Sequence, residues 1–449
     1  MMYYYKKSHG LCNQEIQNNS RIPNPDVIAV PFGYQIEVAV QGLNSPIGIV
    51  FDDKGDLFVA ESGLTTGEAR ILRVTNGETE VIAENFRVPI SGINILNKDI
   101  YVSHRGVITI IGSDGSRTNI IEGLPSYGDY INNRVEFSSD GKIYFGQGTA
   151  TNSGVVGLDN LWIPNHAYFC DIAGSPIIVK GINFETYDIL SSVPQPIYTG
   201  AFSPFGVENL QPVEMFIGNT RASGSILRSN LDGSNLEILA WGFKNPFNVM
   251  FDMNGRLIIA SQGMDDRGSR PIGNAPDTID ELRDGAWYGW PDFAAGVSVE
   301  SQRFTTRTGI QPIRLLETIP DIPPTPIATL APNSNIMGFD INYNPEFGPV
   351  GTLYIALFGN VYYDTMREYI RTGVGHRINQ VDLSTGEVST FAINRSGTPE
   401  IGGFGRPTDV VFGPDGAMYI TDLGFDTYTE PNIFPPGSGI IWRISRMQY

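Results

Sequence analysis

Polar side chains recur at one position of a sequence motif that is repeated along the chain. In most repeats an apolar strand ends in such a residue shortly before a glycine, so equivalent residues should face a common centre. Carboxylates, an imidazole and amides that converge in this way can bind a small ligand and move a proton. A water-filled polar channel is the alternative reading. At the end of the second strand of the motif, the fifth position holds Glu61, His104, Gln147, Ser261, Leu357 and Asp422. The sixth position holds Ser62, Arg105, Gly148, Gln262, Phe358 and Leu423.

A second set of polar residues stands where the first strand of each repeat begins. Here the chain has Gly48, Arg134, Asn248 and Asp409, which are expected to face the same channel. Among the four histidines, His104 alone falls at the predicted channel mouth, beside Arg105. It is a candidate base, because an imidazole titrates near neutrality. The alternative is a hydrogen-bonded structural histidine.

The elements that position these residues are repeated β-hairpins. The repeated motif consists of an apolar strand, a turn with Asp-Gly or Asn-Gly, and a second apolar strand. Such turns indicate β-hairpins, because hairpin turns require positive φ and these residues adopt it readily. A second hairpin follows most copies, so one repeat makes a four-stranded sheet. Six copies predict an all-β, six-bladed β-propeller of four-stranded antiparallel blades. The copies end at Gly63, Gly106, Gly148, Gly263, Gly359 and Gly424.

The last copy has a third strand, Gly439 to Arg446, but no fourth. The segment Tyr34 to Val40 precedes the first repeat and is predicted to supply that strand, which closes the ring and leaves no open edge. We therefore divide the chain into an N-terminal arm over 1–26 and a propeller over 27–449. A long insertion is expected at about 149–224 and a loop insertion at about 265–333.

Composition limits the kind of partner. Asp and Glu number 48 against 30 Lys and Arg, a net charge of −18, which argues against nucleic acid and anionic membranes. The charge suits neutral or cationic ligands, and simple solubility explains it equally well. No apolar run follows Met1 to Lys7, so neither a secretory signal nor a membrane span is expected. The two cysteines, Cys12 and Cys170, lack metal spacing and are expected to be free thiols.

Two segments carry a resemblance to a known family. Leu124 to Gly148 contains GDYINN and a strand ending in Gln-Gly, and Gly242 to Phe293 contains GFKNP, SQGMDD and YGWPDF. Together these segments resemble the glucose/sorbosone dehydrogenase family, with similarity over about Val27 to Arg446. The resemblance implies a propeller that oxidises a sugar or alcohol with pyrroloquinoline quinone (PQQ) and calcium. Members of the family are often periplasmic or extracellular.

The resemblance also implies where the base should lie. In the family a histidine after an aspartate takes the hydroxyl proton while hydride passes to the quinone. The matching pair here is Asp129 and Tyr130. A tyrosine with its ordinary pKa near 10 is a poor base at neutral pH. The departure therefore affects the chemical step itself.

The same resemblance assigns the cofactor's partners. Lys244 and Asn245 take the place of an Arg-Asn pair, and Lys keeps the charge but not the bidentate fork. Gln262 is placed beside them in the Gln-Gly turn. Arg406 matches one of two arginines and Thr408 stands where the other is found, while Leu357 and Phe358 occupy the place of a lysine. Several cationic positions are thus weakened or lost.

Calcium is implied at the backbone carbonyls of Gly263 and Met264. Asp277 is a further metal candidate, because carboxylates follow this turn closely. These carboxylates either hold a structural calcium or lie on a solvated loop. They are Asp265, Asp266, Asp277, Asp280 and Glu281.

Two functions remain open from the sequence. The first is oxidation of a sugar or alcohol with PQQ and calcium, with electrons leaving to a separate carrier because no haem-attachment motif is present. The second is a propeller that has lost redox chemistry and serves as a ligand-binding or surface-assembly protein. The polar arm, Met1 to Asn24, either docks on a neighbouring subunit or folds back on its own ring.

Overall fold

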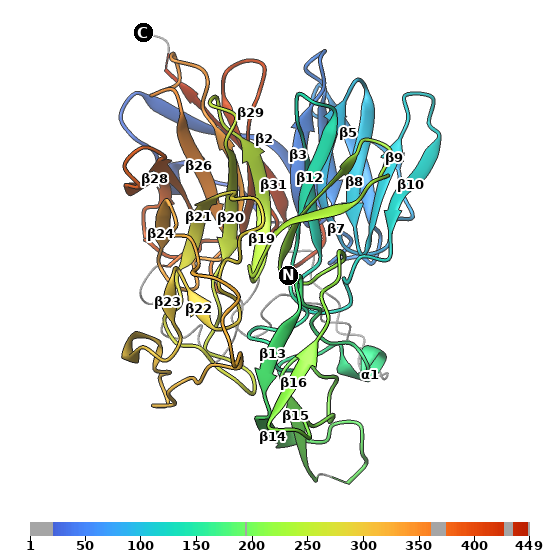
Figure 1. Cartoon of the computed structure of the whole chain (residues 1–449). Coiled ribbons are helices and arrows are strands. Elements are labelled where there is room, and N and C mark those ends of the chain that lie inside the picture. Colours follow the sequence, from blue (N-terminus) through green and yellow to red (C-terminus); the bar gives the residue numbers. More distant parts are fainter. Residues whose placement is uncertain (1–20, 194, 361–373, 426–433, 448–449) are drawn as a thin grey trace.

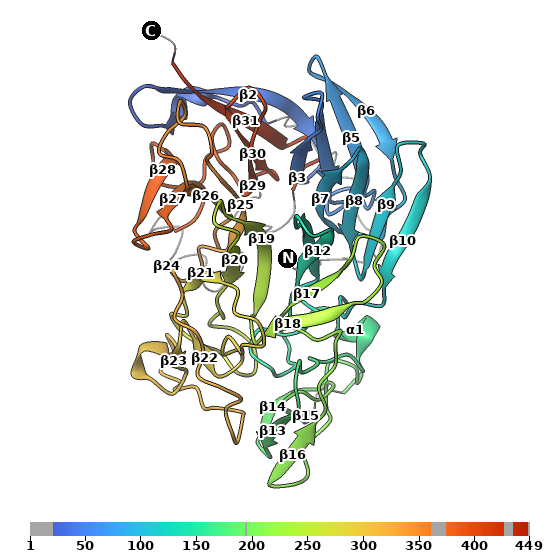
Figure 2. The same cartoon turned by 45° about the horizontal axis from the view of Figure 1, so that its top comes forward.

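The computed structural model describes residues 21–193, 195–360, 374–425 and 434–447. Strands dominate these residues, and the helical elements are the short α1 (Ile163–His166), η1 (Pro25–Val27) and η2 (Gln302–Phe304). Six four-stranded antiparallel sheets stand around a common axis, which confirms the predicted six-bladed propeller (Figures 1 and 2). The innermost strands contact one another in turn around the ring: β3, β7, β11, β19, β25 and β29.

Blades 1 to 3 follow the repeats in chain order. Blade 1 consists of β3 (Pro46–Phe51), β4 (Leu57–Glu61), β5 (Arg70–Thr75) and β6 (Glu78–Ala83). Blade 2 consists of β7 (Ile90–Leu96), β8 (Asp99–His104), β9 (Val107–Ile111) and β10 (Arg117–Glu122). Blade 3 consists of β11 (Asn132–Phe137), β12 (Lys142–Gln147), β17 (Ser225–Asn230) and β18 (Glu237–Trp241).

Blades 4 to 6 complete the ring. Blade 4 consists of β19 (Asn245–Phe251), β20 (Leu257–Gln262), β21 (Asp277–Glu281) and β24 (Ala328–Leu330). Blade 5 consists of β25 (Ile336–Ile341), β26 (Thr352–Leu357), β27 (Arg377–Asp382) and β28 (Val388–Asn394), with β1 (Ile28–Ala29) added at its outer edge. Blade 6 consists of β29 (Pro407–Phe412), β30 (Met418–Asp422), β31 (Gly439–Arg446) and β2 (Tyr34–Leu43).

The ring closes between the two ends of the chain. β2 pairs with β31 in an antiparallel register from Tyr34 opposite Arg446 to Leu43 opposite Gly439. The predicted closing strand is thus confirmed, and it is longer by three residues than the sequence pattern suggested. Closure gives the last blade its fourth strand from a segment about four hundred residues away.

Local sequence explains the hairpins. In blade 1, Asp52 accepts hydrogen bonds from the backbone N–H groups of Lys54 and Asp56, both at 2.9 Å, and Gly55 follows with φ of 86°. Asp252 and Gly255 repeat this geometry in blade 4. Asp stabilises the turn by bonding to nearby backbone, and Gly adopts the positive φ without a steric penalty.

The core lies mainly between the blades. One layer joins Ile258 and Ile279 of blade 4 to Phe339 and Leu353 of blade 5. Each of these side chains is fully buried, and burial of an aliphatic or aromatic side chain contributes about 1.5–3 kcal/mol. Neighbouring blades therefore hold each other, and the strand ends are positioned by these layers.

Two insertions extend from the same end of the ring (Figure 1). The first lies between β12 and β17 and contains α1, β13 (Ile177–Lys180), β14 (Asn183–Tyr187), β15 (Pro196–Gly200) and β16 (Val213–Phe216). The second, predicted as one loop over about 265–333, requires correction, because β21 and β24 of blade 4 fall inside that range. Between them lie β22 (Phe293–Ala294) and β23 (Val297–Ser298). The two insertions join where the N–H of Lys180 donates to Leu315 O at 2.7 Å.

The N-terminal segment is tied to the ring from Arg21 onward. The N–H of Asn24 donates to Gly402 O at 2.7 Å, and β1 pairs with β28. The described end of the arm thus folds back on its own propeller. The predicted docking of the arm on a neighbouring subunit concerns residues that lie mostly outside the described ranges. In the ranges that the structure describes, no helix has the length and hydropathy needed to span a bilayer.

Candidate functional site

The central channel is crossed by an ion pair. Arg134 on β11 and Asp409 on β29 come from blades on opposite sides of the ring, and their charged atoms lie 3.3 Å apart. Both residues were predicted to face the channel. Asp409 also accepts hydrogen bonds from backbone N–H groups of Ile49 and Val410. This ion pair therefore bridges the ring from blade 3 to blade 6.

The polar residues predicted at the channel mouth are mostly buried and paired, Glu61 and His104 within their own blades and Asp422 with the N-terminal segment. Glu61 binds Arg70, and Asp422 binds Arg21 at 2.7 Å. His104 lies between the Thr109 hydroxyl at 2.8 Å and the N–H of Arg87 at 3.2 Å, so both ring nitrogens are occupied. Burial, with Arg117 and Arg87 nearby, lowers the pKa of His104 to about 4. These contacts match the structural alternative for His104 in blade 2.

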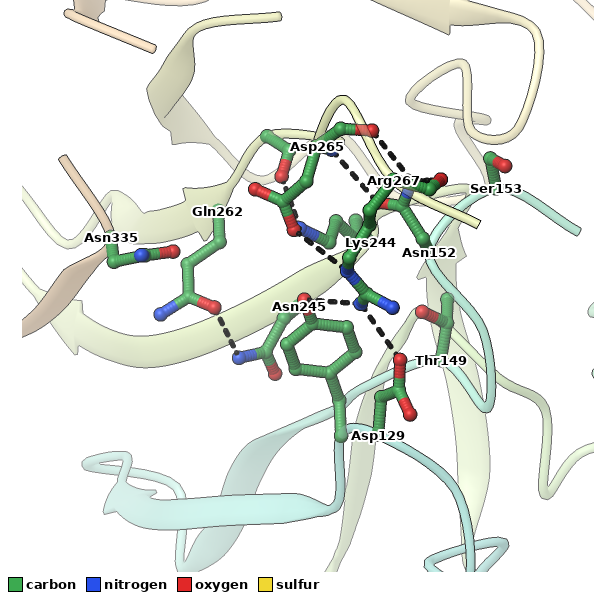
Figure 3. Close-up of polar contacts among 12 residues, drawn as sticks. Asp129, Thr149, Asn152, Ser153, Lys244, Asn245, Gln262, Asp265, Arg267 and Asn335 are labelled. Carbon is green, nitrogen blue, oxygen red and sulfur yellow. Dashed lines mark hydrogen bonds and ion pairs between the residues drawn. The ribbon is translucent and has the colours of Figure 1, made fainter. Parts of the chain in front are cut away.

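Lys244 is the centre of a buried polar cluster between blades 3 and 4 (Figure 3). Its side chain is 2% exposed, and its ammonium donates to Gly263 O and to Asp265 at 2.8 Å. The ammonium also stands 5.0 Å from the centre of the Tyr130 ring. Burial alone would lower the pKa of Lys244, but the negative charge of Asp265 and its hydrogen bond with the ammonium reverse this effect and raise the pKa. Lys244 is therefore a fixed cation with fixed partners.

Arg267 completes the cluster and was not identified from the sequence. Its guanidinium donates to Asp129 at 2.7 Å, to Asp159 and, at 3.4 Å, to Asp265. It comes from the loop after β20, whereas Asp129 precedes β11 and Asp159 lies in the first insertion. Asn152 fixes that loop by bonding to the backbone of Asp265 and Arg267. Burial raises the pKa of Asp159 to about 6, and Arg267 opposes that rise.

Asp129 and Tyr130 meet this cluster as the resemblance implied, but as partners of Arg267. Asp129 accepts from Trp162 Nε1 at 3.0 Å and from Asn160 Nδ2 at 3.1 Å, besides its ion pair. Tyr130 is 5% exposed, and its hydroxyl lies 3.4 Å from Arg267. Burial raises the pKa of Tyr130 further above 10. The hydroxyl is therefore protonated at neutral pH.

The predicted amide ligands form a chain that ends in backbone. Asn245 Nδ2 donates to Gln262 Oε1 at 3.0 Å, and Gln262 Nε2 donates to Ile336 O at 2.9 Å. Figure 3 shows this pair beside the Lys244 cluster. Asn133 donates to Asn245 Oδ1 at 3.1 Å, so the amides are fixed in orientation.

Arg406 and Thr408 lie at blade 6. Arg406 is 1% exposed, and it donates to the carbonyls of Phe358 at 3.1 Å and Asn360 at 2.7 Å while standing over the Phe358 ring. Thr408 is buried, and its hydroxyl bonds to Pro46 O and to Thr421. The side chains of Arg406 and Thr408 thus form hydrogen bonds with residues in and beside blades 1, 5 and 6.

The metal candidates are strand and turn residues. Asp277 begins β21, where it accepts from the N–H of Gly263 at 2.8 Å and of Ile336 at 2.9 Å. Burial raises the pKa of Asp277 to about 7. Met264 is buried at the turn. The solvated-loop alternative is wrong for Asp265, Asp277 and Asp280, which are 1–5% exposed. β21 holds Asp277 and Asp280 in blade 4, and Asp265 is buried with its partners Lys244 and Arg267.

The cluster does not fit PQQ and calcium as it stands. The Gly263 carbonyl, which the resemblance assigns to calcium, already accepts from the Lys244 ammonium, and a divalent cation cannot share that position with a buried ammonium. Two cations, Lys244 and Arg267, face three carboxylates, Asp129, Asp159 and Asp265. No positive charge is left over for a tricarboxylate. In the described part of the chain, no group of three His, Cys, Asp or Glu side chains forms a metal site.

Beside the cluster, a recess opens between blade 4 and the segment that follows β21. Its cavity volume is about 40 Å³, and it is partly open to solvent. Aromatic side chains form much of its wall, and Gln262, Thr278 and Asp280 supply polar groups. Cys170 lies in the first insertion as a free thiol, as predicted, and Cys12 lies outside the described residues.

Comparison with known proteins finds one match among curated sequences. Over 187 aligned positions the chain is 25% identical to quinoprotein glucose dehydrogenase B from Acinetobacter calcoaceticus. The match covers 39% of this chain and 29% of that protein, so it spans less than a third of the relative's length. No protein-family model matches the chain.

Solved structures agree on the fold. The PQQ domain of pyranose dehydrogenase from Coprinopsis cinerea has a TM-score of 0.58 and 16% identity, over 93% of this chain and 97% of that one. The calcium structure of a Trichoderma reesei enzyme of Carbohydrate-Active Enzymes family AA12 also has a TM-score of 0.58, with 14% identity over 96% and 100%. The resemblance predicted from the sequence is confirmed: this chain is a divergent six-bladed propeller similar to the soluble quinoprotein sugar dehydrogenases.

Proposed function

We propose that this chain uses the scaffold of a quinoprotein sugar dehydrogenase as a binding protein for a small ligand, without quinone redox chemistry. The observation that carries the proposal is the contact of the Lys244 ammonium with Gly263 O and Asp265. A cation of the protein itself holds the carbonyl at which calcium is implied. Function depends on the site rather than the fold, and this site has a different charge arrangement.

The position of the base supports the same proposal. Tyr130 stands where the family's histidine is implied, and burial keeps its hydroxyl protonated. A general base needs a pKa near the working pH, so Tyr130 does not accept a substrate proton at neutrality. His104, the other candidate, has both ring nitrogens engaged in blade 2.

A second candidate function is oxidation of a sugar or alcohol hydroxyl with PQQ and calcium. The match to a quinoprotein glucose dehydrogenase favours it. So does the meeting of Asp129, Tyr130, Lys244, Asn245 and Gln262 in one region, since the resemblance assigns all five to that chemistry. This function requires Lys244 to leave Gly263 O and Arg267 to release at least one carboxylate.

Reconstitution with the quinone separates the two functions. The purified protein is mixed with PQQ and calcium chloride, freed of unbound quinone by gel filtration, and assayed for quinone absorbance and for dye reduction with aldoses and alcohols. We expect neither retained quinone nor dye reduction. Stoichiometric quinone with sugar-dependent dye reduction would establish the second function instead.

Tyr130→His is the matched variant for this assay. It restores an imidazole at the implied base position beside Asp129. If the quinone is excluded by Lys244, this variant stays inactive. Activity gained by Tyr130→His alone would mean that the wild-type site already accepts PQQ, which contradicts the proposal.

A further inference from the structure

The recess beside the Lys244 cluster has an aromatic wall. Phe243 and Tyr288 stack with ring centres 4.0 Å apart at 22°, and Trp290 and Phe293 also line the space. Phe243, Tyr288 and Trp290 are almost entirely buried, and Phe293 is partly exposed. The faces of such rings carry negative charge and attract cations within about 6 Å of the ring centre.

A single carboxylate, Asp280, lies in this wall. It is on β21, which pairs with β20 so that Thr278 and Asp280 share the face that contains Ser261. The residue is 5% exposed, and it accepts one hydrogen bond, from the Thr278 hydroxyl at 2.6 Å. Its second oxygen receives no hydrogen bond from any described residue. An uncompensated buried carboxylate is costly, so the position calls for a partner.

No cation among the described residues compensates Asp280. The ion pairs recorded in this region engage Lys244, Arg267 and Arg256, and none of them includes Asp280. Lys244 borders the recess, but its ammonium is bound to Gly263 O and Asp265. Burial raises the pKa of Asp280 to about 7, and no charged side chain offsets this effect. Among the described residues, the second oxygen of Asp280 is therefore left without a counter-charge.

We propose that the recess binds a small organic cation, an ammonium or methylated ammonium group, between Asp280 and the rings of Tyr288, Trp290 and Phe293. The inference rests on the proposed binding role and names the class of ligand. Methyl or methylene groups of the ligand contact the rings, and the positive nitrogen faces the free oxygen of Asp280. The net charge of −18 raises the local concentration of cations near the protein and favours the same class.

A neutral sugar is the competing occupant. Sugars offer hydroxyl donors and acceptors but no charge, so they leave the buried carboxylate without a counter-charge. Asp280 should matter for a cation through its charge and for a sugar through its hydrogen-bonding capacity. Asp280→Asn keeps the oxygen that accepts from Thr278 and removes the charge, so it distinguishes the two.

Calorimetric titration of the full chain with methylammonium chloride, against sodium chloride at equal ionic strength, tests the proposal. We expect saturable binding with Kd of about 1–10 mM, as a single cation–π and carboxylate site of this size allows. Asp280→Asn should weaken binding at least about tenfold. Glu281→Gln is the matched control, because Glu281 is the next carboxylate of the same strand and pairs with Arg256 instead; its affinity should equal wild type.

Further arms keep the test decisive. Phe293→Leu removes one ring face with little loss of volume and should weaken binding about threefold; it carries the test if Asp280→Asn does not fold. Absence of saturable binding, wild-type affinity in both variants, or equal affinity for neutral methanol would overturn the proposal. Binding of D-glucose that Asp280→Asn leaves unchanged would identify a sugar recess instead. The quinone assay tests the proposed function and the cation titration tests the recess, so either proposal can fail without the other.

Discussion

Lys244 and Arg267 hold their positions through carboxylates from three parts of the chain. Asp265 lies two residues before Arg267 and 21 after Lys244, whereas Asp129 precedes blade 3 and Asp159 belongs to the first insertion. Because all five side chains are buried or nearly so, the loss of one partner leaves a charge without compensation. This pairing is the physical reason that the cluster resists a new anionic ligand.

Lys244→Met is predicted to destabilise the protein by about 3–5 kcal/mol, the usual cost of breaking a buried ion pair. Asp265 and Gly263 O would lose their closest donor. Arg73→Met, which breaks the exposed pair with Glu80, serves as control and should cost at most about 1 kcal/mol. Urea unfolding followed by tryptophan fluorescence measures both. Equal, small effects would show that Lys244 is not a structural cation.

Asp280→Asn is predicted to change the pH dependence of stability. The pKa of Asp280 is about 7 in the folded chain and 3.8 in the unfolded reference, so the folded protein binds the extra proton between these values. Its contribution is therefore fully present below pH 4 and is lost as pH rises through 7. The variant should be more stable than wild type above pH 7, by up to about 4 kcal/mol, and the gap should close toward pH 4. Thermal melts across this range check the prediction, and a constant gap would contradict it.

Residue-scale chemistry was only partly predictable. The resemblance brought Asp129, Tyr130, Lys244, Asn245 and Gln262 to one region, and they do meet there. Arg267 was missed because its partner Asp129 is 138 residues away and no spacing rule connects a loop after β20 with one before β11. The burial of Asp280 was missed because the acidic run suggested solvent, whereas β21 is the third strand of a blade.

At the scale of elements, the N-terminal segment acts as a strap over blades 5 and 6. Arg21 is buried, and its guanidinium donates to the carbonyls of Ile401 at 2.8 Å, Ser438 at 3.1 Å and Gly403, and to Asp422 at 2.7 Å. β1 then pairs with the edge of blade 5, and β2 closes blade 6. One short stretch thus links two blades and closes the ring.

Arg21→Met should therefore destabilise the closure by about 3–5 kcal/mol, because Asp422 becomes a buried carboxylate without its cation. Adding Asp422→Asn should recover part of the loss, since the two residues act as a pair. Thermal unfolding of both single variants and the double variant gives the coupling energy. Strict additivity would mean that the ion pair does not hold the strap.

Whole-molecule architecture was the most predictable level. The geometry of turns such as Asp52 to Gly55 and Asp252 to Gly255 is specified by a few neighbouring residues, and the repetition of these turns predicts six blades. Ring closure was predictable because Gly439 to Arg446 lacked a partner strand. The insertions were harder, since β21 and β24 of blade 4 are separated by a long segment with its own short strands. Distance along the chain, rather than weak patterning, hid these contacts.

The joined insertions define one end of the ring, and the Lys244 cluster and the recess both include residues from them. Asp159 and Asn152 come from the first insertion, and Tyr288, Trp290 and Phe293 from the second. The Lys244 cluster therefore lies where the insertions meet blade 4, and its buried charges pair with one another.

A crystal structure of the protein grown with PQQ and calcium chloride would show whether this pairing excludes the cofactor. We expect the Lys244 ammonium to remain within hydrogen-bond distance of Gly263 O and Asp265, with Arg267 on Asp129 and no quinone density in the ring. A calcium ion on Gly263 O, with Lys244 turned toward a bound quinone, would contradict this expectation.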